Sequence, residues 1–143
     1  MSSVVPSKIF PNLYLGSEYT AVNKKVLDEL NIKAIINITP DVPNYFEKEG
    51  IYYHQIPVGD DLYTEIACYF EDAVEFINSH IKNGKSVLVH CRMGISRSPS
   101  IVIAYIMKTK NISFMNALEF VQQKHKDTDP NLNFCGQLAN YKF

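Results

Sequence analysis

The fold of this 143-residue chain is organised around the sequence His90-Cys91-Arg92-Met93-Gly94-Ile95-Ser96-Arg97-Ser98. The short apolar run Ser86–Val89 precedes it and predicts a buried strand. The longer apolar run Ile101–Met107 follows it and suits a central helix, with Pro99 in the first turn, where no amide donor is missed. The local order is therefore a strand, a tight loop and a helix N-terminus.

The loop has the composition of an anion site. A helix N-terminus offers unpaired N–H groups and the positive end of a dipole, and a short loop entering it can point the N–H groups of residues 92–97 at one centre. Gly94 supplies the backbone freedom for such a cradle, and the planar guanidinium of Arg97 can bind two oxygens of a tetrahedral dianion. At the floor, Cys91 is expected to be a thiolate at neutral pH and a nucleophile for phosphoryl transfer.

Both arginines of the chain lie in this loop. Among 14 basic residues only Arg92 and Arg97 are arginine, and the others are lysine. A need for bidentate binding explains Arg97, whereas Arg92 could be exposed and contact either the substrate or the surroundings of the site. Taken alone, Cys91 could be a buried structural thiol, but the strand, loop and helix around it favour the nucleophile.

Composition excludes several classes of function. The chain carries 15 acidic and 14 basic residues, so a net charge of −1 gives no support for nucleic acid or an anionic membrane as the main partner. A hydrophobic content of 46% is typical of a globular protein, and the length predicts one domain over residues 1–143. Met1–Pro6 does not resemble a signal peptide, and the apolar runs are too short to span a membrane.

Cysteines and histidines indicate a reduced protein without a metal or other cofactor. The cysteines are odd in number and widely spaced, which favours an intracellular setting, cytoplasmic or nuclear; they are Cys68, Cys91 and Cys135. The histidines outside the loop lack paired spacing and predict no metal site; they are His54, His80 and His125.

Strand and helix patterns alternate before the loop. Residues 7–16 predict an edge strand with a Pro-Asn turn, and residues 33–38 and 51–58 predict further strands, with a loop over 40–50 between them. Ser17 can cap a helical segment whose apolar face carries Val22, Val26, Leu27 and Leu30.

Two more helices are predicted by apolar spacing. Thr64 is expected to cap the clearest amphipathic helix, which runs from Ile66 to Ile81 and ends at Gly84. Ser113 can cap a helix with Ala117, Leu118 and Val121 turned inward and with cations at its C-terminal end, Lys124, His125 and Lys126. The alternation predicts an α/β fold: a mainly parallel sheet of about five strands, with helices on both faces.

The pattern His90-Cys91, five residues, Arg97-Ser98 resembles the signature of cysteine-based protein tyrosine phosphatases, and the form HCRMGISRS resembles their compact dual-specificity branch. The resemblance extends from about Ser7 to Tyr141 and includes residues 129–138 as the turn into a last helix. Asn133 stands where the family commonly has glycine, a mild departure because Asn also tolerates a left-handed backbone.

The resemblance implies a cysteinyl-phosphate mechanism with a general acid. Asp60 and Asp61 both follow a predicted strand and the mobile Gly59, and spacing alone does not choose between them. The family's acid usually lies six residues before the first apolar position of the next helix, Ile66, which selects Asp60. Both aspartates could instead be solvated turn residues.

Supporting roles are also implied by the resemblance. The Ser98 hydroxyl would bond to the thiolate and help it leave; it could instead be simply a helix cap, and the two roles are compatible. His90 would orient the loop and favour the thiolate, or it could be a buried histidine with satisfied hydrogen bonds. Asn131 would brace the loop, or it could be an ordinary turn residue. The substrate phosphate would be held by residues 92–97, that is Arg92, Met93, Gly94, Ile95, Ser96 and Arg97.

The expected function is a dual-specificity protein phosphatase, acting on phosphotyrosine and phosphoserine or phosphothreonine with a mildly acidic optimum. Phosphoproteins would be its partners. A phosphoinositide or RNA 5′-phosphatase and a phospho-binding protein without turnover are the alternatives, followed by a sulfur-transferring or arsenate-reducing enzyme.

Overall fold

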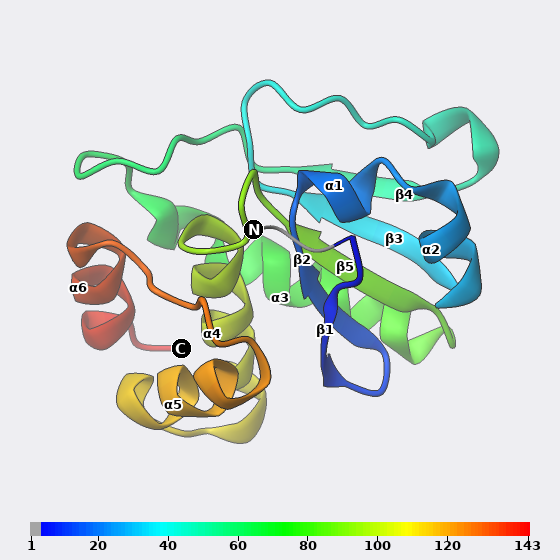
Figure 1. Ribbon diagram of the computed structural model, residues 1–143. Helices are drawn as coiled ribbons and strands as arrows, with labels where there is room; N and C mark the ends of the chain where they lie inside the picture. Colours follow the sequence, from blue (N-terminus) through cyan, green and yellow to red (C-terminus); the bar gives the residue numbers. More distant parts are fainter. Residues whose placement is uncertain (1–3) are drawn as a thin grey trace.

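A five-stranded sheet forms the centre of the computed structural model, which describes residues 4–143 (Figure 1). The strand order is β1-β2-β5-β3-β4; β1 pairs antiparallel with β2, and all other pairs are parallel. The strands are β1 (Ser7–Phe10), β2 (Leu13–Gly16), β3 (Ile32–Asn37), β4 (Tyr52–Gln55) and β5 (Ser86–His90). The predicted α/β fold with a mainly parallel sheet is confirmed.

Six α-helices and two short 3-10 helices lie among residues 4–143. The α-helices are α1 (Glu18–Ala21), α2 (Lys24–Glu29), α3 (Phe70–Lys82), α4 (Arg97–Lys110), α5 (Phe114–Lys124) and α6 (Leu132–Asn140). The 3-10 helices are η1 (Glu47–Glu49) and η2 (Ile66–Tyr69).

Alternate residues of the central strands pack against helices on opposite faces of the sheet. Leu13, Leu15 and Val87 belong to a large buried cluster with residues of α3, α4, α5 and α6. Tyr14 and Leu88 belong to a smaller cluster with residues of α1 and α2. This two-residue period is that of a strand buried on both faces, and it confirms helices on both sides of the sheet.

Helix α4 is the central helix that the apolar run predicted. Every residue from Arg97 to Met107 is buried, and Pro99 lies in the first turn. The helix contacts α3, α5, α6 and the strands β2 and β5. Its N-terminus is therefore held firmly at the point where β5 ends.

The N-terminal third differs from its prediction in two places. Residues 7–16 form a hairpin, so β1 alone is the edge strand and β2 lies inside the sheet. The helical segment after Ser17 is two short helices, because the Asn23 side chain accepts a hydrogen bond from the Val26 N–H (3.1 Å) and starts a second helix. Val22, expected on the inward face, is 47% exposed at this break. Ser17 caps α1 as predicted.

The predicted strand 51–58 and the predicted amphipathic helix from Ile66 also differ from the structure at their ends. β4 covers Tyr52–Gln55, shorter than the predicted 51–58. Thr64 caps no helix: the residue before η2 is Glu65, and the Ala67 N–H, which a cap at Thr64 would have bonded, donates to Gln137 Oε1 (2.9 Å). The chain enters α3 through η2. By contrast, Ser113 caps α5 by accepting from the Asn116 N–H (3.2 Å), as predicted.

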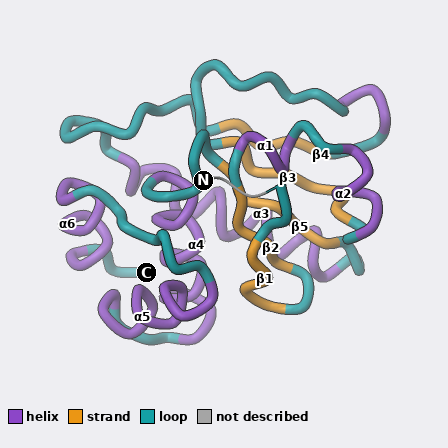
Figure 2. Tube along the Cα trace, in the orientation of Figure 1, coloured by secondary structure: helices purple, strands orange, loops and turns teal. Residues whose placement is uncertain are grey.

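The parallel strands place their carboxyl ends at one edge of the sheet. β2, β3, β4 and β5 all end there, and Figure 2 shows their loops leaving the sheet together. Ligands of open α/β sheets bind outside this edge. The loop after β5 is the sequence singled out above, and residues 91–97 are called the Cys91 loop from here on.

Candidate active site

The Cys91 loop encloses a small cavity at the N-terminus of α4. The cavity has a volume of about 160 Å³ and is lined by Asp60, Cys91, Arg92, Met93, Ile95, Ser96 and Arg97. Cys91 is 2% exposed, and its sulfur accepts a hydrogen bond from the Gly94 N–H (3.3 Å). The Ser98 hydroxyl lies 3.2 Å from the same sulfur. The sulfur thus lies at the bottom of the cavity with two hydrogen-bond partners.

Carbonyl groups of the loop are held from outside it. Four of them accept hydrogen bonds: Cys91 O from His90 Nδ1 (3.0 Å), Arg92 O from Glu18 N (3.0 Å), Gly94 O from His125 Nε2 (2.7 Å) and Ile95 O from Asp129 N (2.8 Å). A trans peptide is planar, with its C=O and N–H pointing opposite ways. Fixing these carbonyls outward therefore directs the next N–H groups, those of residues 92, 93, 95 and 96, to the inside of the loop, which is how an anion cradle is built.

Gly94 is required by the shape of the loop. Its φ of +75° lies in the left-handed region, where side chains are strained. A Cβ on this residue would also meet the carbonyl oxygen of Gly16 at 3.0 Å. The loop therefore packs directly on the end of β2 at this point.

Arg97 is buried along the wall of the cavity. One guanidinium nitrogen, Nη1, donates to the Val58 carbonyl (2.9 Å), which fixes the plane of the group. Nε is buried and has no partner among residues 4–143. A buried unpaired donor is costly, and an anion oxygen in the cavity is the kind of group that would satisfy it.

Arg92 forms ion pairs with carboxylates, whereas Arg97 bonds to a backbone carbonyl. Its guanidinium pairs with Asp41 (2.5 Å) and lies 3.6 Å from the Glu18 carboxylate. The side chain is 43% exposed, so these ion pairs are weak individually. They fasten the Cys91 loop to α1 and to the loop after β3, while Arg92 also belongs to the lining of the cavity.

Asp60 and Asp61 have distinct surroundings. Asp60 lines the cavity, and its carboxylate accepts a hydrogen bond from Asn131 Nδ2 (2.7 Å). Asp61 is outside the cavity lining, and its carboxylate accepts from the N–H groups of Tyr63 (2.9 Å) and Thr64 (2.7 Å). These bonds hold the pKa of Asp61 below its usual range, which suits a turn-forming carboxylate rather than a proton donor.

Asn131 connects three parts of the site. It caps α6 by accepting from the Phe134 N–H (2.9 Å), its own N–H donates to the Ser96 hydroxyl (2.9 Å), and its side chain donates to Asp60. The link to Ser96 is a direct brace on the Cys91 loop. The neighbouring Asn133 is helical, so its tolerance of a left-handed backbone is not used; it donates to the Thr64 carbonyl (2.8 Å) instead.

His90 is buried and uncharged at neutral pH. Desolvation lowers its pKa to about 4, and the nearby charge of Arg97 acts in the same direction. The neutral ring donates through Nδ1 to the Cys91 carbonyl. His90 therefore orients the loop by a hydrogen bond, without supplying a positive charge to the sulfur.

Ser98 lies inside the first turn of α4 with its hydroxyl toward Cys91. The residue at the N-cap position is Ser96, and it makes no side-chain capping bond. The alternative interpretation of Ser98 as the helix cap is wrong.

Two contacts of the site had no signal in the sequence. The sequence pattern places His125 among the cations at a helix end and gives Glu18 no role, yet both bond to carbonyls of the Cys91 loop. No sequence motif relates the position of either residue in the chain to that of the loop. Only the packing of α1 and α5 around β2 and α4 brings them there.

Of the residues in the N-terminal prediction, Met1, Ser2 and Ser3 lie outside the described residues 4–143. Within that range, groups of three or more His, Cys, Asp or Glu that could hold a metal are not found. The helices described are also too short or too polar to cross a membrane. All three thiols are free: Cys68 is exposed, Cys135 is half-buried and Cys91 is buried.

The family model for the dual specificity phosphatase catalytic domain matches residues 13–143. This chain belongs to the dual-specificity phosphatase family. The resemblance read from the 90–98 sequence is thereby confirmed at the level of the family, over nearly all of the chain.

Curated relatives and solved structures agree with that membership. Human dual specificity protein phosphatase 1 is 44% identical over 138 residues, and human dual specificity protein phosphatase 9 is 41% identical over 138 residues; each alignment covers 96% of this chain. The alignments cover only 37% of dual specificity protein phosphatase 1 and 36% of dual specificity protein phosphatase 9, so the chain spans about a third of the length of these relatives.

Among solved structures, DUSP15 superposes with a TM-score of 0.91 at 32% identity, over 96% of this chain and 86% of the other. The human tyrosine phosphatase-like serine/threonine/tyrosine-interacting protein superposes with a TM-score of 0.88 at 33% identity, over 95% and 94%. The dual-specificity phosphatase fold therefore extends over nearly the full length of the structure.

Proposed function

We propose that this member of the family is a dual-specificity protein phosphatase that hydrolyses phosphotyrosine and phosphoserine or phosphothreonine through a cysteinyl-phosphate intermediate. The observation that carries the proposal is one cavity that combines the Cys91 sulfur, the inward N–H groups of the loop, the Arg97 guanidinium and the Asp60 carboxyl. These are a nucleophile, an oxyanion cradle and a proton donor within one small volume.

In the first step the Cys91 thiolate attacks phosphorus in line with the ester bond. An S–P bond forms and the P–O bond to the substrate breaks, while the loop N–H groups and Arg97 hold the equatorial oxygens. Asp60 gives its proton to the leaving oxygen, so that the product departs as an alcohol or phenol.

In the second step water hydrolyses the cysteinyl-phosphate. The ionised Asp60 accepts a proton from the water as its oxygen attacks phosphorus, and the S–P bond breaks. The sulfur leaves as a thiolate, which the Ser98 hydroxyl (3.2 Å away) and the Gly94 N–H (3.3 Å) stabilise. Phosphate is released and Asp60 is again protonated for the next cycle.

The substrate class follows from the relatives and from the loop. The curated relatives are named dual specificity protein phosphatases, and the side chains of Met93, Ile95 and Ser96 add no positive charge to the cavity. A phosphoprotein is therefore favoured over a phosphoinositide or an RNA 5′-end. The three free thiols support a reducing compartment, the cytoplasm or the nucleus.

The test is turnover of four substrates by the wild type and two cysteine variants. The substrates are a phosphotyrosyl peptide, a phosphothreonyl peptide, a short-chain phosphoinositide and a 5′-triphosphorylated RNA. We expect the wild type to hydrolyse both peptides faster than the other two, Cys91→Ser to hydrolyse none, and Cys68→Ser, which alters an exposed thiol, to match the wild type. A wild type that binds the phosphopeptides without releasing phosphate, or that prefers the lipid or RNA, overturns the proposal.

A further inference from the structure

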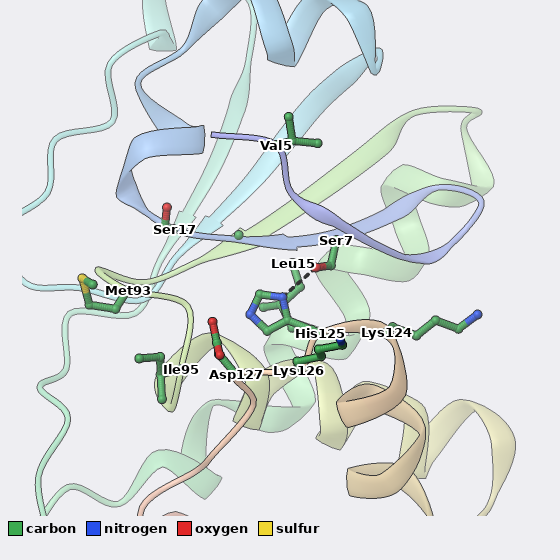
Figure 3. A pocket seen from close by; sticks show the side chains of 11 residues that line it. Val5, Ser7, Leu15, Ser17, Met93, Ile95, Lys124, His125, Lys126 and Asp127 are labelled. Carbon is green, nitrogen blue, oxygen red and sulfur yellow. Dashed lines mark hydrogen bonds between the residues drawn. The ribbon is translucent and has the colours of Figure 1, made fainter. Parts of the chain in front are cut away.

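His125 joins the Cys91 loop to the first strand of the sheet. It follows the last turn of α5, its Nε2 lies 2.7 Å from the Gly94 carbonyl oxygen, and its Nδ1 lies 2.7 Å from the Ser7 hydroxyl. Figure 3 shows the ring between Ser7 of β1 and the part of the loop that carries Met93 and Ile95. The ring borders a second cavity, of about 220 Å³, on this side of the loop.

The hydrogen-bond partners determine where the proton of the ring lies. The Gly94 carbonyl can only accept, so Nε2 must carry the proton and donate. In the neutral ring Nδ1 is then an acceptor, and the Ser7 hydroxyl donates to it. The Ser7 hydroxyl thus satisfies the second ring nitrogen in the tautomer that the bond to Gly94 needs.

This bond acts on the cradle through one peptide plane. The Gly94 carbonyl points out of the loop toward His125, so the N–H of Ile95, which belongs to the same planar peptide, points into it. Gly94 has a left-handed φ of +75°, a conformation that glycine leaves and enters readily. A donor that fixes this carbonyl therefore restricts the rotation of the peptide that follows the glycine of the loop.

We propose that His125 is a positioning residue of the phosphate cradle: with Ser7 behind it, it holds the Gly94–Ile95 peptide so that the Ile95 N–H faces the bound oxyanion. The proposal rests on the proposed function for its catalytic consequence. His125 is absent from the lining of the cavity around Cys91, so it acts on phosphate only through the loop.

The experiment compares His125→Leu, which removes the donor, with His125→Gln, whose side-chain amide can donate from nearly the same place. His80→Leu is the matched control, because His80 lies at the end of α3, packed beside Phe76, away from the loop. The probe is inorganic phosphate, titrated by ³¹P NMR into each variant made in a Cys91→Ser background. The same variants with Cys91 intact give kcat and KM on a phosphotyrosyl peptide.

We expect His125→Leu to weaken phosphate binding about tenfold and to lower kcat by a similar factor. The reason is that the Ile95 N–H would no longer be held toward the phosphate, and the loss of one hydrogen bond to a charged group has about this effect. His125→Gln should recover most of both, and His80→Leu should match the parent in both. Thermal unfolding of each variant is recorded so that all titrations are done on folded protein. If His125→Leu does not fold, His125→Asn, whose side chain is too short to reach Gly94, takes its place against His125→Gln.

Parent-like phosphate affinity in His125→Leu overturns the proposal, as does equal weakening in His125→Leu and His125→Gln, which would indicate a packing role only. The phosphate titration is independent of turnover. Should the wild type lack phosphatase activity, the proposed function fails while the positioning role of His125 is still decided by binding.

Discussion

The side-chain amide of Asn131 donates to the carboxylate of Asp60 over 2.7 Å, although 71 residues separate them in the chain. The same amide also donates to the Asp61 carbonyl (3.0 Å). Asn131 thus holds the loop that follows β4 by both a carboxylate and a backbone group. Because its own N–H bonds to Ser96, the position of Asp60 is tied to the Cys91 loop through a single residue.

Removing the amide of Asn131 should slow the step that needs a general acid. In Asn131→Asp the side chain can still accept from the Phe134 N–H and cap α6, but it no longer donates to Asp60. We expect kcat on a phosphothreonyl peptide, which has a poor leaving group, to fall about tenfold, with a smaller loss on an aryl phosphate.

Asn131→Ala is the companion variant, because it loses both the amide and the cap. It should be about 1 kcal/mol less stable than Asn131→Asp in urea unfolding while showing a similar loss of kcat. Equal losses of kcat on the two leaving groups would contradict a role through Asp60.

Asp60→Asn and Asp61→Asn distinguish the two carboxyls. Asn at position 60 cannot give a proton, so turnover of the phosphothreonyl peptide should fall about 10²–10⁴-fold while phosphopeptide binding is retained. Asn at position 61 keeps the acceptor oxygen for the Tyr63 and Thr64 N–H groups and should change turnover little. The loss of turnover appearing in Asp61→Asn instead would show that the acid is misassigned.

Ser98→Ala should make the second chemical step slower than the first. The hydroxyl lies 3.2 Å from the Cys91 sulfur, and a hydrogen bond to a leaving thiolate contributes about 1.5–3 kcal/mol, or roughly a 10- to 100-fold rate effect. A rapid burst of alcohol or phenol, equal to the enzyme concentration, should then precede slow turnover in stopped-flow measurements.

Ser100→Ala is the control for that burst. Its hydroxyl is also buried in α4 but donates to the Ser96 carbonyl (2.7 Å), and it lies outside the lining of the cavity. A burst of equal size in both variants would mean that the effect belongs to the helix and not to Ser98.

The buried His90 should make the protein less stable in mild acid. Its pKa is about 4 when folded and about 6.5 when unfolded, so between these values the unfolded chain binds a proton that the folded protein excludes. The folded state therefore keeps its full stability above pH 6.5 and loses it as pH falls toward 4, by about 2 kcal/mol at pH 5 and about 3 kcal/mol at pH 4 from this residue.

Urea unfolding at pH 7 and pH 5 measures this loss. His90→Asn can still donate to the Cys91 carbonyl but does not titrate, so its stability should fall less between the two pH values, by about 2 kcal/mol. An identical loss in the wild type and in His90→Asn would exclude His90 as the source.

Much of the architecture could be predicted because the local pattern of apolar residues shows which helices and strands are buried and on which side. The run 101–107 is apolar on all sides, which only a helix buried on all sides explains, and α4 is such a helix. The departures occur where a side chain competes for backbone groups: Asn23 divides one predicted helix into two, and Gln137 takes the Ala67 N–H that a cap at Thr64 would have bonded.

By itself the sequence determined where the Cys91 loop lies and what it is made of, because the end of one strand, one glycine and one helix N-terminus all lie within a dozen residues of each other. Only the tertiary structure decided which aspartate lines the cavity, where Arg92 pairs and that His125 bonds to Gly94. Those contacts join segments from different elements, and the spacing along a chain carries no record of which distant side chains the packing of a sheet and its helices brings together.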